Sequence, residues 1–454
     1  FPLRSTSLFR PILVGTVMAV LVVLALQPLF VAILVFTRSH ADLTAIRAHI
    51  TQAYAEGVLS ADEQPTRFMQ GGGHQFTECT GLLLSIDNQP DPLTAALYPQ
   101  LHSKYRGPCV ELQGIAAGHE TADRTSYARY WHGYRAYLWP MLSLFSLETV
   151  RAINAVLLYA ATLVFFLSLR RAIGATPAAA FFIVLLSLTD IWRMWNITTH
   201  ALSMMLILAG AAVFARLYPR TRNVVLAIAV AAVFGAVFNF VDFLVNPPLM
   251  PMLFGFIVLA AELQRPVPIT RACVGPAMVK AGFVVLAWFG AYGLTWASEW
   301  ALAIWMSPNG HQAGLSILKE ITLRLYGVEP DSVVPMYPLV PTLTMIVQSF
   351  ISVGSVTVAV LAAAMIVHLR TNWSTFEWRR FLLLISPTLV ATAWFEILNN
   401  HTQTHSHFTY RSESAAIAII FAAAVMATNA PATIGSLLRN LWRRVRRGDV
   451  EPAV

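Results

Sequence analysis

Long apolar runs, separated by short polar or basic segments, recur along the whole chain. A helix of about 20 apolar residues can cross a hydrocarbon layer about 30 Å thick. The runs predict about ten membrane-spanning helices, at residues 11–37, 148–169, 176–191, 199–216, 223–241, 247–263, 281–298, 338–368, 381–397 and 414–429. The predicted fold class is therefore an all-α polytopic membrane protein, with a single membrane domain over residues 1–454.

The composition agrees with a membrane location. Hydrophobic residues make up 57% of the 454 residues and charged residues only 12%, about half the charged share of a typical soluble domain. The net charge of +8 could indicate a nucleic-acid partner, but the arginines gather in short loops between apolar runs and in the tail LWRRVRRGDV (441–450). This is the positive-inside pattern, so we expect membrane lipid, and no nucleic acid, as the partner.

The basic loops also predict the orientation of the chain. Arg4 and Arg10 precede the first apolar run, so we expect the N-terminus in the cytoplasm, together with a basic C-terminal tail at residues 430–454. Residues 38–137 then form a large first extracytoplasmic loop, and residues 299–337 form a second one. Loops this long usually carry a function or structure of their own.

The first loop opens with a predicted amphipathic helix in ADLTAIRAHITQAYAEG (41–57). Leu43, Ile46, Ile50 and Tyr54 fall on one face of this helix. Such a face suits a helix that lies on the membrane surface, and it suits equally a helix that packs on its own loop domain.

The chain has three cysteines, and their positions differ in kind. Cys79 and Cys109 lie in the first outer loop, whereas Cys273 lies in a loop on the opposite side. Two cysteines in an oxidising compartment predict a disulfide. A metal site with His74 or His102 is the alternative, but the spacing typical of zinc ligands is absent.

Five polar and aromatic segments lie at or beyond the predicted outer ends of helices. They are HETADRTSYARYWHGYR (119–135), TDIWRMWNITTH (189–200), FNFVDFLVNPP (238–248), WASEW (296–300) and NNHTQTHSHFTYR (399–411). Trp, Tyr, Arg and His often anchor helices at membrane interfaces, and we expect this role for the second and fourth segments. The other three predict a functional site, because Asp242 is costly near membrane depth and because three histidines and Arg411 crowd the last segment.

The residue types favour a phosphate or sugar site over a metal site. His401 and His405 would share a helical face, but no HExxH motif is present, and the nearby carboxylates are Glu396 and Glu413. The sequence also has no Walker A, GxSxG or CxxC motif, which argues against nucleotide-driven transport and serine hydrolase chemistry. Arginine, in contrast, forms paired hydrogen bonds that suit a phosphate group.

The order of these segments resembles that of integral-membrane glycosyltransferases of the GT-C fold. One helix leads into a large outer loop, which ends in YARYWHGYRAYLWPML (127–142) and is followed by SLETVRAINAVLLYA (146–160). Five segments are similar to bacterial membrane proteins associated with polysaccharide assembly: FTECTGLLLSI (76–86), YARYWHGYR (127–135), FVDFLVNPPL (240–249), WASEWALA (296–303) and HTQTHSHFTYR (401–411). In one respect the chain departs from that family, because Asp42 is the only carboxylate directly after the first helix.

The resemblance implies membrane-surface helices in the first outer loop and an inverting transferase in the bacterial inner membrane. The donor would be a sugar on a polyprenyl phosphate such as decaprenyl phosphate, and a pentofuranose such as arabinofuranose is one expected sugar. The acceptor would be an envelope glycan, a lipid or a pilin-like protein on the extracytoplasmic side. The lipid-linked sugar serves as co-substrate, and we expect no further cofactor and no metal.

An inverting transferase needs a carboxylate to take the acceptor's proton and cationic groups to stabilise the leaving phosphate. We expect Glu78 to be the base, with Asp123, Asp42 and Asp242 as alternatives. The expected residues for the donor phosphate are Arg135, Arg411, His132 and His407. The expected residues for the sugar or the acceptor are Asp242, Tyr130, Trp131, Tyr410 and His405.

Two other functions fit the same pattern less well. A transporter or flippase for a lipid-linked anion would share the basic outer site, but the sequence shows no clear internal repeat. A membrane acyl- or phosphotransferase would be favoured by a site centred on histidine. A scaffold protein would not need a carboxylate such as that of Asp242 near membrane depth.

Overall fold

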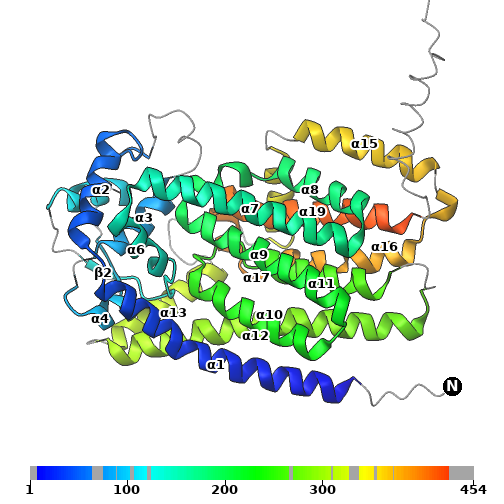
Figure 1. The fold of residues 1–454 in the computed structure, drawn as a ribbon, viewed down its shortest axis with the longest axis horizontal. Coiled ribbons are helices and arrows are strands. Elements are labelled where there is room, and N and C mark those ends of the chain that lie inside the picture. Colours follow the sequence, from blue (N-terminus) through cyan, green and yellow to red (C-terminus); the bar gives the residue numbers. More distant parts are fainter. Residues whose placement is uncertain are drawn as a thin grey trace, which may run out of the picture.

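A bundle of long helices with a smaller helical subdomain at one end makes up this protein (Figure 1). The computed structural model describes residues 8–63, 75–87, 89–102, 107–119, 124–264, 269–307, 310–326, 337–351, 355–371 and 373–428. Within these residues the only strands are β1 (Gln100–His102) and β2 (Arg124–Ser126), which form one antiparallel pair.

Seven helical segments of the described chain are long and apolar enough to cross a membrane. They are α1 (Phe9–Ser39), α7 (Leu147–Ile173), α9 (Thr198–Thr221), α10 (Val224–Val241), α12 (Arg271–Met306), the run Trp378–Ile397 and α19 (Ser406–Ala427). The run Trp378–Ile397 comprises α16 (Trp378–Ile385), η3 (Ser386–Thr388) and α17 (Leu389–Ile397). The prediction of a helical, multi-pass membrane protein is confirmed at this level.

The count of ten spans stays a prediction. Two of the expected spans correspond to α8 (Ala175–Leu188) and α11 (Leu249–Glu262), which have 14 residues each. A helix of that length rises only about 21 Å, less than the hydrocarbon thickness. After α8 the chain turns into the 3-10 helix η1 (Ile191–Asn196) instead of continuing as one helix.

The single span expected at residues 338–368 is wrong. The structure has two helices in this segment, α14 (Val340–Phe350) and α15 (Ser355–Thr371). Near the end of α14, the Ser349 hydroxyl donates to the Met345 carbonyl one turn earlier and also contacts α19. Side-chain bonds of this kind compete with the backbone ladder, and the intervening sequence contains Gly354, a weak helix former.

The bundle packs through small residues at its closest helix contacts. α10 lies against both α1 and α12, and α9 lies against α7 and α11. A Cβ at Gly235 of α10 would lie 2.4 Å from the carbonyl oxygen of Trp288 in α12. Glycine there lets the two backbones approach closely, as is common between membrane helices.

The subdomain is formed by the first predicted outer loop. It contains α2 (Leu43–Ala55), α3 (Gln75–Ser85), α4 (Pro92–Leu97) and α5 (Pro108–Ala116), and it leads into α6 (Arg135–Leu144). The apolar face of α2 packs on α5 and α6, where Ile46 and Ile50 are fully buried. This contact corresponds to the second alternative for α2, a helix that packs on its own loop domain.

The disulfide predicted between Cys79 and Cys109 is present and joins α3 to α5. The phenol of Tyr54 on α2 donates to the Cys109 carbonyl at 2.6 Å, so α2, α3 and α5 are held together at one point. The alternative metal site would involve His74 or His102, and His74 and the side chain of His102 lie outside the described residues.

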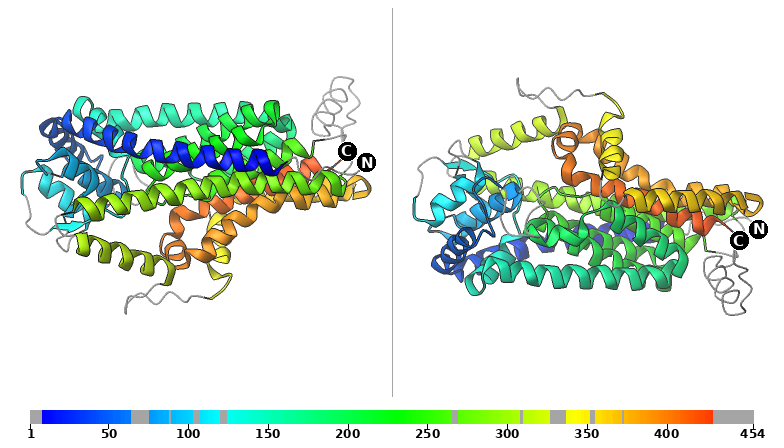
Figure 2. Two further views of the ribbon diagram at one scale, coloured as in Figure 1. Left: turned by 90° about the horizontal axis from the view of Figure 1, so that it is seen from below. Right: turned by 90° about the horizontal axis from the view of Figure 1, so that it is seen from above.

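The start of α1 and the end of α19 lie at the end of the bundle opposite the subdomain (Figure 2). At the subdomain end, α12 extends to Met306 and is followed by α13 (Gly310–Tyr326), which packs beside it. The short α18 (Asn399–Thr404) contacts α13. The expected second outer loop, 299–337, therefore contains the last turns of α12 and all of α13, while the basic tail 430–454 lies outside the described residues.

Candidate functional site

A group of charged and polar side chains lies where the subdomain meets α13 and α18. Glu320 on α13 forms ion pairs with Arg129, from the loop before α6, and with Arg324 one turn later at 4.0 Å. The Arg324 guanidinium also contacts the Nδ1 atom of His401 on α18. The His401 ring lies 4.7 Å from that of His405. We call these five residues the basic cluster.

The histidines of the basic cluster are neutral. A guanidinium can only donate hydrogen bonds, so Nδ1 of His401 must accept, and its Nε2 donates to the Leu244 carbonyl at 3.1 Å. Burial, reinforced by the neighbouring Arg324, lowers the pKa of His405 to about 3 and that of His401 well below its usual value. Two guanidinium groups and one carboxylate therefore leave the cluster with one net positive charge.

The two arginines of the cluster keep unused donor capacity. The side chains of Arg129 and Arg324 are 20% and 18% exposed, and their buried Nε atoms have no hydrogen-bond partner in the part of the chain that the structure describes. A buried donor that lacks a partner loses the free energy of its hydration, so a bound anion would stabilise this arrangement.

Aromatic rings fix the loop that carries Arg129. The indole nitrogens of Trp296 and Trp300, both on α12, donate to the Arg129 carbonyl at 2.7 and 3.1 Å. The buried ring of Tyr130 stacks on Trp296 with the ring centroids 5.8 Å apart. The predicted sugar-binding residues Tyr130 and His405 therefore lie at the basic cluster, because His405 stands next to His401 and Tyr130 follows Arg129.

Strained backbone marks the contact between this loop and the break after α10. His132 and Leu244 both have positive φ, 52° and 59°, a conformation that side chains disfavour. Between them, the Gly133 amide donates to the Phe240 carbonyl at 2.7 Å, and a Cβ at Gly133 would lie 2.4 Å from that oxygen. Only glycine at position 133 lets the two backbones come this close. In the same turn, the Leu244 carbonyl accepts the hydrogen bond from His401.

Asp242 holds this turn in place. Its carboxylate accepts from the Ser203 hydroxyl at 2.7 Å and from the Val245 amide at 3.1 and 3.2 Å. The partner that a buried carboxylate requires is thus supplied by α9 and by the turn itself. This arrangement favours a structural role for Asp242 over contact with a sugar.

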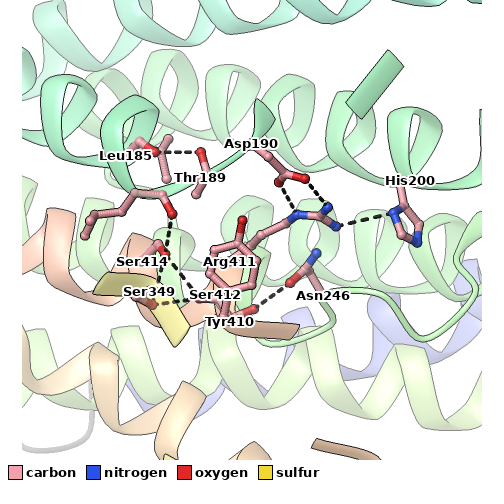
Figure 3. A network of polar contacts seen from close by, with 11 residues as sticks. Leu185, Thr189, Asp190, His200, Asn246, Ser349, Tyr410, Arg411, Ser412 and Ser414 are labelled. Atoms are coloured by element: carbon pink, nitrogen blue, oxygen red, sulfur yellow. Dashed lines mark hydrogen bonds and ion pairs between the residues drawn. The ribbon is translucent and has the colours of Figure 1, made fainter. Parts of the chain in front are cut away.

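Arg411 forms the centre of a second network, shown in Figure 3. Its guanidinium makes two parallel bonds to Asp190, at 2.6 and 2.7 Å, and a third contact with Nδ1 of His200 at 3.4 Å. Although burial alone would raise the pKa of Asp190, the Arg411 charge outweighs it and lowers the pKa. Tyr410 lies beside this pair, with its ring 5.9 Å from the guanidinium. Arg411 is therefore already paired with a carboxylate and has little capacity left for a donor phosphate.

Glu78 is likewise occupied. One carboxylate oxygen accepts from the backbone amide of Thr198 at 2.7 Å, and the other accepts from the Thr198 hydroxyl at 3.0 Å. Arg151 on α7 lies 3.8 Å away. Burial raises the pKa of Glu78, while Arg151 and Thr198 oppose the rise. Glu78 thus caps the N-terminus of α9 and ties the subdomain to the bundle.

Arg135, expected at the donor phosphate, instead donates to three backbone carbonyls, those of His132, Ala95 and Ala96. Trp131 is buried and donates to the Thr295 carbonyl at 2.8 Å. Both side chains therefore fix the loop.

The remaining expected residues are dispersed. His132 is buried and its Nε2 donates to the Tyr127 carbonyl. Asp42 caps the exposed start of α2, and its side chain accepts from Ala45. His407 is exposed at the start of α19, and Asp123 lies outside the described residues.

No role was predicted from the sequence for Arg129, Glu320, Arg324 or Glu299. Glu320 and Arg324 are four residues apart in an amphipathic stretch. This spacing indicates a helix that carries both side chains on its polar face. Glu299 on α12 is buried, and its Oε2 has no hydrogen-bond partner among the described residues.

No protein-family model matches this sequence, and neither a curated protein nor a solved structure is significantly similar to it.

Within the described residues no three His, Cys, Asp or Glu side chains are grouped as metal ligands. His401 uses both of its ring nitrogens in hydrogen bonds to protein groups.

Proposed function

We propose that this protein is a membrane glycosyltransferase of the GT-C type, which transfers a sugar from a polyprenyl-phosphate donor at the subdomain end of the bundle. The observation that carries the proposal is the basic cluster, in which Arg129 and Arg324 share one carboxylate beside two neutral histidines. We place the donor phosphate there, in place of the expected Arg135 and Arg411.

A phosphate suits the cluster for two reasons. The net positive charge lies in a mostly buried place, where an uncompensated charge is costly and an anion is favoured. In addition, guanidinium groups match the geometry of phosphate oxygens through paired hydrogen bonds, and neither Nε atom makes a hydrogen bond to the described residues. A leaving phosphate that gains charge during transfer would be stabilised by the same groups.

A lipid-linked sugar suits the surroundings of the cluster. Apolar helices long enough to span a membrane adjoin it, so a donor carried by a lipid tail could reach it from the bilayer. The rings of Tyr130, Trp296 and Trp300 border the loop that carries Arg129, and aromatic faces commonly stack on sugar rings. An envelope glycan, a lipid or a pilin-like protein would then be the acceptor on the extracytoplasmic side.

For the base we now favour Glu299. Glu78, Asp42 and Asp242 all use their carboxylates to cap helices or turns, whereas the buried Glu299 Oε2 has no hydrogen-bond partner among the residues that the structure describes. Glu299 also lies next to Trp300, on the helix that fixes the Arg129 loop. In the inverting reaction the Glu299 carboxylate would take the acceptor hydroxyl proton while that oxygen bonds to the anomeric carbon and the lipid phosphate leaves.

Transfer from a panel of synthetic polyprenyl-phosphate sugars tests the proposal. The purified protein in detergent would be given pentofuranosyl donors, arabinofuranose among them, and hexosyl donors, together with envelope acceptors. Product from one donor, and its loss in Glu299→Gln with donor binding retained, is the expected result. If the panel gave no product, no donor hydrolysis and no donor binding, the proposal would be contradicted. Donor binding without turnover would favour a flippase for a lipid-linked anion.

A further inference from the structure

The first turn of α9 carries polar atoms that are buried and unpartnered. The Thr199 hydroxyl and the His200 Nε2 have no hydrogen-bond partner among the described residues, and the same holds for the phenol oxygen of Tyr134. The three side chains are at most 2% exposed. Buried polar groups are nearly always satisfied in folded proteins, so three unsatisfied groups call for a ligand or ordered water.

Two of these side chains lie against the same glycine. A Cβ at Gly81 of α3 would lie 3.2 Å from Thr199 Cγ2 and 3.5 Å from Tyr134 Cε2. His200 is the next residue of α9, and Figure 3 shows its Nε2 pointing away from Arg411. Thr199 and Tyr134 thus lie where α3 and the starts of α6 and α9 meet, and His200 follows Thr199 in the first turn of α9.

The hydrogen-bonding character of the groups is mixed and neutral. Because Arg411 can only donate to Nδ1 of His200, the proton of His200 resides on Nε2, which is a donor. The hydroxyls of Thr199 and Tyr134 can both donate and accept. The His132 ring lies 5.7 Å from the Tyr134 ring, and its buried Nδ1 is an acceptor that has no partner in the described part of the chain.

This mixture does not suit a phosphate, which only accepts and needs positive charge. It suits a ligand whose groups both donate and accept, as sugar hydroxyls do. His200 is also close to the basic cluster, because the Phe408 ring lies 5.2 Å from the His200 ring and 5.2 Å from the His405 ring.

We infer that Tyr134, Thr199 and His200 bind the hydroxyls of the donor's sugar ring while the basic cluster holds its phosphate. The inference rests on the proposed function and adds the residues that recognise the sugar. It also gives a role to TDIWRMWNITTH (189–200), for which interface anchoring was expected.

The test compares the affinity of the purified protein for two lipids in detergent, the sugar-bearing polyprenyl phosphate that supports transfer and the same polyprenyl phosphate without sugar. Thr199→Val and Tyr134→Phe remove one hydroxyl each with little change of shape. We expect each to weaken binding of the sugar-bearing lipid about tenfold, the loss of one hydrogen bond. Binding of the bare lipid should stay within about twofold of wild type.

Two matched variants control for packing. Thr162→Val, whose hydroxyl bonds to its own helix, should alter neither affinity. Thr199→Ser, which keeps the hydroxyl but loses the methyl against Gly81, should retain sugar binding even if it lowers stability.

Unchanged affinity for the sugar-bearing lipid in the Thr199→Val, Tyr134→Phe double variant would overturn the inference and indicate ordered water in place of a ligand. An equal loss for both lipids would also overturn it, since it would indicate a distorted phosphate site. Failure of the wild type to bind either lipid would refute the proposed function itself, and this inference with it.

Discussion

Replacement of Glu78 by glutamine separates a structural role from a catalytic one. The substitution keeps the shape of the side chain and an oxygen acceptor for Thr198, but it removes the charge that faces Arg151 at 3.8 Å. Both side chains are 1% exposed. Loss of one partner of a buried ion pair typically costs about 3–5 kcal/mol, because the other charge stays buried.

The geometry puts the expected loss at the lower end of this range. The Arg151 and Glu78 atoms are too far apart for a hydrogen bond, and Arg151 also donates to the Val58 carbonyl at 3.2 Å. We therefore expect Glu78→Gln to lower the free energy of unfolding by about 3 kcal/mol. Molecules that remain folded should still bind donor and transfer sugar.

The assay is reversible denaturation in mixed micelles, paired with transfer measured well below the unfolding midpoint. Glu56→Gln, an exposed change in the same subdomain, should leave stability unchanged. Adding Arg151→Met to Glu78→Gln should recover part of the loss, since the buried cation that faced Glu78 is then gone. Unchanged stability together with abolished transfer would refute this reasoning and return Glu78 to the role of base.

Three further predictions concern the other networks. Replacing both Cys79 and Cys109 by serine should lower the free energy of unfolding by about 3–4 kcal/mol, given the 30-residue separation, and denaturation of the double variant checks this value. Glu320→Gln should raise the affinity for bare polyprenyl phosphate several-fold, because it increases the net charge beside both arginines; a titration that shows weaker binding would contradict the charge argument. Arg411 lowers the pKa of Asp190 below 3.8. Their ion pair should therefore stabilise the fold fully above about pH 4, and progressively less as the pH falls through the lowered pKa. A Tm profile in which Asp190→Asn loses no more stability at pH 7 than at pH 3 would exclude this linkage.

Features that depend on local periodicity were predictable from the sequence. Apolar runs located the long helices such as α1 and α7, because a span requires a continuous stretch of apolar residues. The period of the apolar residues located α2 and its buried face, including Ile46 and Ile50. The position of Cys79 and Cys109 in one predicted outer loop was sufficient to predict their disulfide.

Partners that are far apart in sequence were not predictable. The sequence identifies Arg135 and Arg411 as candidate phosphate ligands, but only the fold shows that the first donates to carbonyls and that the second pairs with Asp190. A guanidinium serves either purpose with the same donors, so the residue type alone does not distinguish them. Arg129 and Glu320 are 191 positions apart by number and meet only because α13 packs at the subdomain end.

Whether the basic cluster holds the lipid phosphate is tested by the affinity of Arg324→Met for bare polyprenyl phosphate, with Lys319→Met on the exposed side of the same helix as control. If the basic cluster holds the lipid phosphate, Arg324→Met should weaken binding at least tenfold and reduce its dependence on salt, because a charge-assisted contact contributes about 1.5–3 kcal/mol. Lys319→Met should bind as the wild type does. Equal affinity of wild type and Arg324→Met would show that the phosphate binds elsewhere and would contradict the account.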